Sequence, residues 1–295
     1  MSELGHELAT CAEEIEGLLV ELLPVVSGPQ ARLHEAMRYS TLNGGKRLRP
    51  FLVAAGADLF DVPRSRSLRV GAAIEMIHSY SLVHDDLPAM DDAATRRGRP
   101  SCHARFDQAT AILAGDALQS LAFEVLADAA THPDASVRVA LLRDLAIAAG
   151  AAGMCGGQMI DLEAEQRALD LDEIVVLQRL KTGALFRFAL EAGAVLGGAS
   201  AADRAALRDF ADDLGLAFQI KDDLLDVTGD PELAGKDLGQ DAAAGKATLV
   251  ALLGVGTAEQ KLEALQTSAG GHLVRFGDTA LSLRQVFGFV VQRSH

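Results

Sequence analysis

The residues best suited to chemistry form two clusters of aspartate that lie far apart in the chain. The first spans Asp85–Asp92 and places four carboxylates within eight residues. Its neighbours are largely apolar, so these charges should be partly buried and should need partners. On a regular helix Asp85 and Asp92 would share a face, whereas Asp91 would lie about 100° away. Pro88 disfavours a regular helix, and the spacing leaves open which of the two joins Asp85.

The second cluster contains Asp222, Asp223 and Asp226. Asp222 and Asp226 are one helical turn apart, and like charges at this spacing repel unless a cation lies between them. Either cluster alone also fits a solvated acidic helix end, but the pair is more specific. Oxygen ligands without His or Cys favour a hard ion, of which Mg²⁺ completed by phosphate oxygens is the natural case.

Two basic segments supply the groups that an anionic ligand would need. The segment Gly44–Pro50 reads GGKRLRP, and Arg96–Pro100 follows shortly after the first aspartate cluster. Glycine lets the backbone approach a phosphate, and arginine donates forked hydrogen bonds to it. Either segment alone could be a solvated basic turn. Together with the aspartates they predict a metal-bridged diphosphate held by cationic side chains, with His78 on the helix face of Asp85.

Three further features could contribute to such a site. Lys181, Thr182 and Gly183 lie where a helix could be interrupted, and carbonyls freed at a break could face a developing positive charge. Lys236 and Lys246 lie in or beside a stretch rich in Gly and Asp, Thr228 to Gly245, which is a candidate flap over the site.

Composition narrows the class of protein. The 295 residues include 41 Asp plus Glu against 27 Lys plus Arg, a net charge of −14, which argues against a nucleic-acid-binding protein. Hydrophobic residues reach 49%, enough for a sizeable core. The three cysteines form neither a zinc pattern nor a disulfide framework, and the N-terminus has no apolar core of a secretory signal. We expect a cytoplasmic protein with no membrane span.

Apolar periodicity predicts helices almost throughout and no convincing strand. We therefore expect one all-α domain over residues 1–295, with roughly ten or more helices around a central active-site cavity. The predicted helices cover an N-terminal segment that ends at Pro24 and then about 29–42, 47–59, 67–83, 104–130, 135–165, 171–196, 202–227, 246–253, 258–267 and 279–292.

These motifs together resemble the trans (all-E) prenyl diphosphate synthase family, and most of all its bacterial farnesyl diphosphate synthases. The likeness rests on Gly44–Pro50, Asp85–Asp91 with Arg96-Arg97-Gly98, Lys181-Thr182, Phe218-Gln219 leading into Asp222–Asp226, and Gly235-Lys236-Asp237. It covers about residues 37–251 closely. The resemblance implies an isoprenoid synthase fold, a homodimer, and about three Mg²⁺ ions per active site.

Matching positions of this sequence take roles from the resemblance. Asp85, Asp91 and Asp222 would bind the metal ions, and Asp86, Asp223 and Asp226 would bind them directly or through water. The remaining residues would contact substrates: Arg96, Lys181 and Lys236 the allylic diphosphate; Lys46, Arg49, His78 and Arg97 isopentenyl diphosphate; Thr182 and Gln219 the allylic carbon; and Lys246 a phosphate beside the flap.

The resemblance also implies a product. Tyr80 precedes Asp85 by five residues, at the position where an aromatic forms the floor of the tail pocket, and the small Ser81 leaves that role to Tyr80. The implied reaction condenses isopentenyl diphosphate with dimethylallyl and geranyl diphosphate to farnesyl diphosphate. Alternatives are a geranylgeranyl or longer-chain synthase, a non-catalytic subunit of a heteromeric synthase, and a terpene cyclase. A terpene cyclase would not need a second diphosphate site, so Lys46, Arg49 and His78 argue against it.

Overall fold

The computed structural model of the protein describes residues 2–164, 166–228 and 248–293. The chain forms two compact units. The first comprises Met1–Arg143 with Val195–Gly197, and the second comprises Asp144–Ala194 with Gly198–His295. The prediction of one domain over the whole chain stays a prediction.

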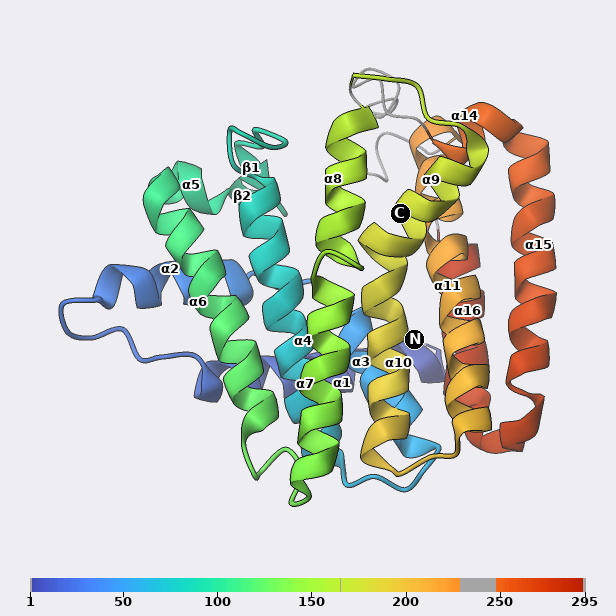
Figure 1. The fold of residues 1–295 in the computed structure, drawn as a ribbon, viewed down its shortest axis with the longest axis horizontal. Coiled ribbons are helices and arrows are strands. Elements are labelled where there is room, and N and C mark those ends of the chain that lie inside the picture. Colours follow the sequence, from blue (N-terminus) through green and yellow to red (C-terminus); the bar gives the residue numbers. More distant parts are fainter. Residues whose placement is uncertain (1, 165, 229–247, 294–295) are drawn as a thin grey trace. The chain divides into compact units, whose positions relative to one another are not determined.

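The first unit is a set of helices with one short hairpin. Its helices are α1 (Glu3–Leu22), α2 (Ala31–Thr41), α3 (Leu48–Asp58), α4 (Arg64–Asp85), α5 (Cys102–Arg105), α6 (Gln108–Ala127) and the first part of α7 (Ala135–Ala149). The hairpin pairs β1 (Thr95–Arg96) antiparallel with β2 (Arg99–Pro100), so that Arg96 lies opposite Arg99. Figure 1 shows α4 running beside α6, against which it packs.

Helix α4 is the central helix of this unit, because α1, α2, α3 and α6 all pack against it. Its buried residues follow no single stripe, and an apolar helix buried on all sides shows such a pattern. Glu75, Ser79 and Asp86 nevertheless lie buried on it or at its end. Burying a polar group without a hydrogen bond costs free energy. The buried polar residues of α4 therefore favour a functional role for this helix.

The second unit is built around the long helix α11 (Ala201–Thr228), on which α14 (Leu249–Leu253), α15 (Val255–His272) and α16 (Leu281–Gln292) pack. The other elements of this unit are the remainder of α7, α8 (Met154–Ala164), α9 (Leu171–Gln178), a π-helical turn (Arg179–Gly183), most of α10 (Ala184–Leu196) and a 3₁₀ helix (Val274–Ala280).

The all-α prediction is confirmed, with two corrections in detail and one prediction that stays untested. The hairpin at 95–100 was not predicted, because strands of two residues are too short to show alternation. The helices expected over 104–130 and 135–165 are each two helices, separated near Phe106 and at residues 150–153. The candidate flap at Thr228 to Gly245 lies, after Thr228, outside the described residues, as do Lys236 and Lys246.

Two stretches, Gln108–Ala127 and Ala135–Ala164, are long and apolar enough to cross a membrane by length and composition. Core helices of soluble proteins pass the same test. The second stretch consists of α7 and α8, of 15 and 11 residues, and each is shorter than the roughly 20 residues that a span needs. Helix α6 buries Ala111, Ala114 and Leu118 inside the protein. The absence of a membrane span stays a prediction.

Candidate active site

The first aspartate cluster lies where α4 ends. The helix stops at Asp85, and the backbone N–H of Asp91 returns to donate to the Asp85 carbonyl at 2.9 Å. Asp92 has a φ of +47°, a left-handed conformation that ends any helical continuation. The first cluster is therefore closed by a turn and does not continue as a helix. The hydrogen bond of this turn joins Asp91, and not Asp92, to Asp85.

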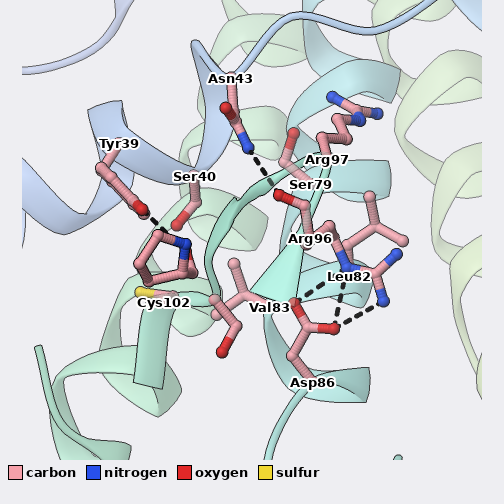
Figure 2. Close-up of a pocket in the computed structure, with 12 residues that line it drawn as sticks. Tyr39, Ser40, Asn43, Ser79, Leu82, Val83, Asp86, Arg96, Arg97 and Cys102 are labelled. Atoms are coloured by element: carbon pink, nitrogen blue, oxygen red, sulfur yellow. Dashed lines mark hydrogen bonds and ion pairs between the residues drawn. The ribbon is translucent and has the colours of Figure 1, made fainter. Parts of the chain in front are cut away.

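Within this cluster Asp86 is buried and already bonded. The Arg96 guanidinium donates to both of its carboxylate oxygens, with Nε–Oδ2 2.9 Å and Nη2–Oδ1 2.6 Å (Figure 2). Burial alone would lower the pKa of Arg96, but the bond and charge of Asp86 outweigh it and the pKa is raised. Asp86 thus fixes Arg96, while Asp85 is half-buried and Asp91 exposed.

The hairpin that carries Arg96 is bound to the end of α2. The Tyr39 hydroxyl donates to the Pro100 carbonyl at 2.7 Å, and the Asn43 amide donates to the Arg96 carbonyl at 3.5 Å (Figure 2). Arg99 lies over the Tyr39 ring, 4.4 Å from its centroid, and donates to Asn43 Oδ1 at 3.1 Å. These contacts place the second basic segment beside the first, and Tyr39 and Asn43 were not predicted from the sequence.

The two basic segments meet at Gly45. Arg97 donates to the Gly44 carbonyl, and a Cβ added at Gly45 would lie 2.7 Å from the Arg97 guanidinium. Gly45 also has a φ of +121°, which side chains other than glycine's rarely permit. The glycine pair is therefore required both for the turn and for the close approach of Arg97.

Arg49, Arg97 and His78 form a cationic region in the same unit. Burial lowers the pKa of His78 well below its ordinary value, and Arg49 and Arg97 lower it further. The imidazole is therefore neutral near pH 7. Burial also lowers the pKa of Arg49, with a further contribution from Arg97, although both guanidinium groups remain charged at neutral pH. Such a concentration of positive charge favours a bound anion.

A small cavity lies between α2, α4 and the hairpin, lined by Ser40, Asp86, Arg96, Arg97 and Cys102 among others (Figure 2). Its volume of about 30 Å³ admits about two water molecules. It is too small for a prenyl diphosphate, and we interpret it as a solvated space behind the Asp86–Arg96 pair.

The second cluster lies in the last two turns of α11. Asp222 is half-buried and accepts a hydrogen bond from Arg293 at 2.7 Å. Arg293 also donates to the Phe218 carbonyl and lies over the Phe218 ring, 4.0 Å from its centroid. Burial lowers the pKa of Arg293, and Asp222 offsets part of this effect. This pairing was not predicted from the sequence.

Asp223 and Asp226 are buried, in contrast to Asp222. Asp223 accepts from the Gln219 amide at 2.9 Å and from the Leu249 backbone N–H at 3.0 Å. The same carboxylate therefore orients Gln219 and fastens the start of α14 to α11. As in the first cluster, one aspartate has an internal partner while a neighbour is more exposed.

Lys181 and Thr182 lie in the π-helical turn, so the predicted interruption of the helix is confirmed. Single π-helical turns recur at functional sites. Lys181 forms an ion pair with Asp161 of α8, with Nζ–Oδ2 2.6 Å. A Cβ at Gly157 would collide with the Lys181 backbone, so glycine permits α8 to pack this closely. Asp161 was missed because nothing in the sequence connects it to Lys181.

Tyr80 lies on α4 with 5% of its surface exposed. Its ring meets the His84 ring edge-on, with centroids 5.7 Å apart. Ser81 donates its hydroxyl to the His78 carbonyl at 2.9 Å, which keeps that hydroxyl on its own helix. Tyr80 is therefore a rigidly held ring about 7.5 Å along the helix axis from Asp85, at ~1.5 Å per residue.

In the part of the chain that the structure describes, no three His, Cys, Asp or Glu side chains converge tightly enough to hold a metal ion unaided. Mg²⁺ is usually held by one or two carboxylates, with substrate phosphates and waters completing its shell. The half-buried and exposed aspartates of the two clusters fit this kind of ligation.

Comparison with known proteins agrees with this geometry. The polyprenyl synthetase family model matches residues 30–272. The chain is similar to farnesyl diphosphate synthase of Escherichia coli, with 42% identity over 99% of both chains. It is similar to that of Geobacillus stearothermophilus, with 42% identity over 96% of this chain and 95% of the relative. The crystal structure of an FPP/GFPP synthase from Zymomonas mobilis superposes with a TM-score of 0.90, at 49% identity over 98% and 99% of the two chains. This protein belongs to the polyprenyl synthetase family.

Proposed function

We propose that this protein is a magnesium-dependent prenyltransferase that condenses isopentenyl diphosphate with dimethylallyl and then geranyl diphosphate, and releases farnesyl diphosphate. The observation that carries the proposal is the assembly at the end of α4. Carboxylates that suit a hard cation lie there beside two arginine-bearing segments. A diphosphate bridged by metal ions needs both kinds of group.

Asp85, Asp91 and Asp222 are the proposed ligands of three Mg²⁺ ions. They are more exposed than Asp86 and Asp223, whose buried carboxylates accept from internal donors, although Asp222 also accepts one bond from Arg293. Bound Mg²⁺ would neutralise the negative charge that develops on the leaving diphosphate. The protein contributes the carboxylates and keeps the neighbouring aspartates bonded elsewhere.

Cationic side chains complete the two proposed substrate sites. Isopentenyl diphosphate would be bound by Lys46, Arg49, His78 and Arg97. This set places three positive charges and the neutral imidazole of His78 in one unit. Arg96 and Lys181 would bind the allylic diphosphate, together with Lys236 outside the described residues. Asp86 and Asp161 hold Arg96 and Lys181 before substrate arrives, which lowers the entropy lost on binding.

The reaction breaks the allylic C–O bond and forms a C–C bond to isopentenyl diphosphate. Loss of a proton, in our proposal to the departing pyrophosphate, completes the new double bond. Thr182 and Gln219 would face the allylic carbon with oxygen atoms, and Asp223 orients the Gln219 amide. The step requires orientation and charge stabilisation, so it needs no side-chain nucleophile.

Tyr80 supports the fifteen-carbon product, because a buried ring at this point of α4 would shorten a tail pocket that starts at the aspartates. Similar proteins differ in product. The Zymomonas mobilis structure bears the name FPP/GFPP synthase, and geranylgeranyl pyrophosphate synthase 4 of Arabidopsis thaliana is 38% identical over 96% of this chain. A longer product is therefore the alternative that an experiment must exclude.

We further propose that the protein acts in the cytoplasm as a homodimer. Ile112 and Leu113 of α6 expose 44% and 56% of their surfaces, which leaves apolar area for a second copy to cover. Light scattering of the purified protein would report twice the 31.0 kDa chain mass. A measured mass equal to that of a single chain would exclude the homodimer.

The direct experiment incubates purified protein with labelled isopentenyl diphosphate and dimethylallyl diphosphate, and separates the dephosphorylated products by chromatography. We expect a fifteen-carbon product in Mg²⁺, none with a chelator, and full recovery when Mg²⁺ is restored. A twenty-carbon product would replace farnesyl by geranylgeranyl diphosphate. Absence of any condensation would favour a non-catalytic subunit.

A further inference from the structure

Arg47 lies inside the first basic segment but does not face solvent as its neighbour Lys46 does. Its side chain is 2% exposed. It donates to Glu75 Oε1 at 2.5 Å, to Glu16 Oε2 at 2.6 Å and to the Thr41 carbonyl at 2.8 Å. One guanidinium group thus connects the start of α3 to α1, to the end of α2 and to α4.

The backbone at Arg47 explains why so many contacts are present. Arg47 has a φ of +46°, a left-handed conformation that costs energy for any residue with a Cβ. Gly44 and Gly45, separated from it by Lys46, also have positive φ, and helix α3 begins directly after it. Such a conformation persists only where surrounding contacts fix it. The Arg47 guanidinium provides those contacts at the turn from which Lys46 and Arg49 project.

Glu75 is the most deeply buried partner of this guanidinium, with a side chain 3% exposed. It lies one turn before His78 on α4 and so connects the turn to the helix that carries both His78 and Asp85. Glu75 also offsets part of the lowering of the pKa of Arg49 and Arg97, which places its charge within reach of both arginines. Glu75 therefore joins Arg47 by a direct bond and lowers the net positive charge around Arg49 and Arg97.

Stability alone gives little reason for a buried Arg47–Glu75 pair. A buried ion pair contributes little net stability compared with well-packed apolar residues, whereas it fixes the geometry of the groups that it joins. Here the joined groups are the turn of the first basic segment and the helix of His78. Geometry is what a two-part diphosphate site requires, because forked hydrogen bonds to phosphate tolerate little displacement.

We propose that Glu75 is a positioning residue for isopentenyl diphosphate: by binding Arg47 it fixes the left-handed turn that presents Lys46 and Arg49 to the diphosphate. The inference rests on the proposed function, in which Lys46, Arg49, His78 and Arg97 form that substrate site. Glu75 itself does not contact substrate. Its effect should therefore appear in the affinity for one substrate and not in the chemistry of the other.

The test is steady-state kinetics of Glu75→Gln with each substrate varied in turn. Glutamine keeps the shape and an acceptor oxygen but removes the charge, so Arg47 loses the charge-assisted bond that holds the turn. We expect KM for isopentenyl diphosphate to rise about tenfold or more, the loss typical of a bond to a charged group. KM for the allylic diphosphate should be unchanged. Arg47→Lys, which keeps the charge but loses the fork, should show the same split.

Glu191→Gln is the matched control. Glu191 is 8% exposed and accepts from Arg208 at 2.7 Å, so this change removes a comparably buried carboxylate from the second unit. Because Glu191 belongs to neither proposed set of substrate-binding residues, we expect the change to lower thermal stability without altering either KM. If Glu75→Gln only does the same, Glu75 is structural and the inference is wrong.

Two further variants keep the test decisive. Glu16→Gln changes the more exposed of the two carboxylates that bind Arg47, so it should give a smaller rise in KM for isopentenyl diphosphate. This variant replaces Glu75→Gln in the test if Glu75→Gln does not fold. An unchanged KM there would then overturn the proposal. Arg49→Ala tests the substrate site itself. If Arg49→Ala does not selectively raise KM for isopentenyl diphosphate, the proposed function fails; if it does and Glu75→Gln does not, only the role of Glu75 fails.

Discussion

The two aspartate clusters contain similar residues but are built differently. In the first unit the helix ends at Asp85 and a closed turn connects it to Asp91, whereas Asp222 and Asp226 lie on one continuous helix. The first cluster pairs with Arg96 of the hairpin, but the described partners of the second are Arg293, Gln219 and a backbone N–H.

The two clusters nevertheless share one arrangement of buried and exposed aspartates. Each has a buried aspartate with internal donors, Asp86 or Asp223, next to a more exposed aspartate that we propose binds metal. Aspartates in such a motif are therefore not equivalent: we propose that the buried one fixes the protein structure and that its more exposed neighbour binds metal, although Asp222 also pairs with Arg293. Substitutions at each kind of aspartate, and in each unit, separate these roles.

The largest expected effect is on turnover. Asp85→Ala and Asp222→Ala should each lower kcat by about 100-fold or more, because each removes a ligand that stabilises charge in the transition state, and about 1.4 kcal/mol is lost per factor of ten. Circular dichroism and thermal unfolding should show a folded protein in both cases. Full activity in either variant would mean that the corresponding cluster does not bind catalytic metal.

A change of product is expected only from the first unit. Tyr80→Ala removes a buried ring from α4, so the tail pocket should deepen and the products should shift to twenty carbons or more. Chromatography of the labelled products measures the shift. The matched control is Phe210→Ala, which removes a fully buried ring from α11 of the second unit and should destabilise the protein without lengthening the product. A Tyr80→Ala variant that folds and still stops at fifteen carbons would move the pocket floor elsewhere.

The internally bonded aspartates should differ in their contribution to stability. Asp86→Asn weakens a forked ion pair with Arg96, and we expect a loss of about 1–2 kcal/mol in the free energy of unfolding. Asp223→Asn keeps an acceptor for the Leu249 N–H, so the loss should be about 0.5–1 kcal/mol. Urea unfolding measures both values. The reverse order would show that Asp223 is the stronger internal anchor.

The last effect appears only on acidification and concerns His78. Its folded-state pKa lies below the unfolded value of 6.5, so the unfolded chain binds the proton more readily. Stability from this group is therefore complete above pH 6.5 and is lost as pH falls below that value, by at most about 1.4 kcal/mol per pH unit. Urea unfolding between pH 7.5 and 5.5 should show wild type losing more stability than His78→Gln. Parallel curves would exclude a depressed pKa.

Sequence reasoning succeeded where spacing alone defines structure. The all-α class, the family and the break at Lys181 followed from periodicity and motif order, because each depends on residues close in the chain. It left the relation of Asp85 to Asp91 open, since a turn does not repeat with helical period. It missed Asp161, Glu75 and Arg293 as partners because their contacts join residues brought together only by folding.

The most direct test of the account is where metal binds. A crystal of the protein with Mn²⁺ and inorganic pyrophosphate would locate the ions by anomalous scattering. We predict ions in contact with Asp85, Asp91 and Asp222, with Asp86 still bonded to Arg96 and Asp223 still bonded to the Leu249 N–H. Ions coordinated by Asp86 or Asp223 in place of their exposed neighbours would contradict the division between ligand and internal anchor.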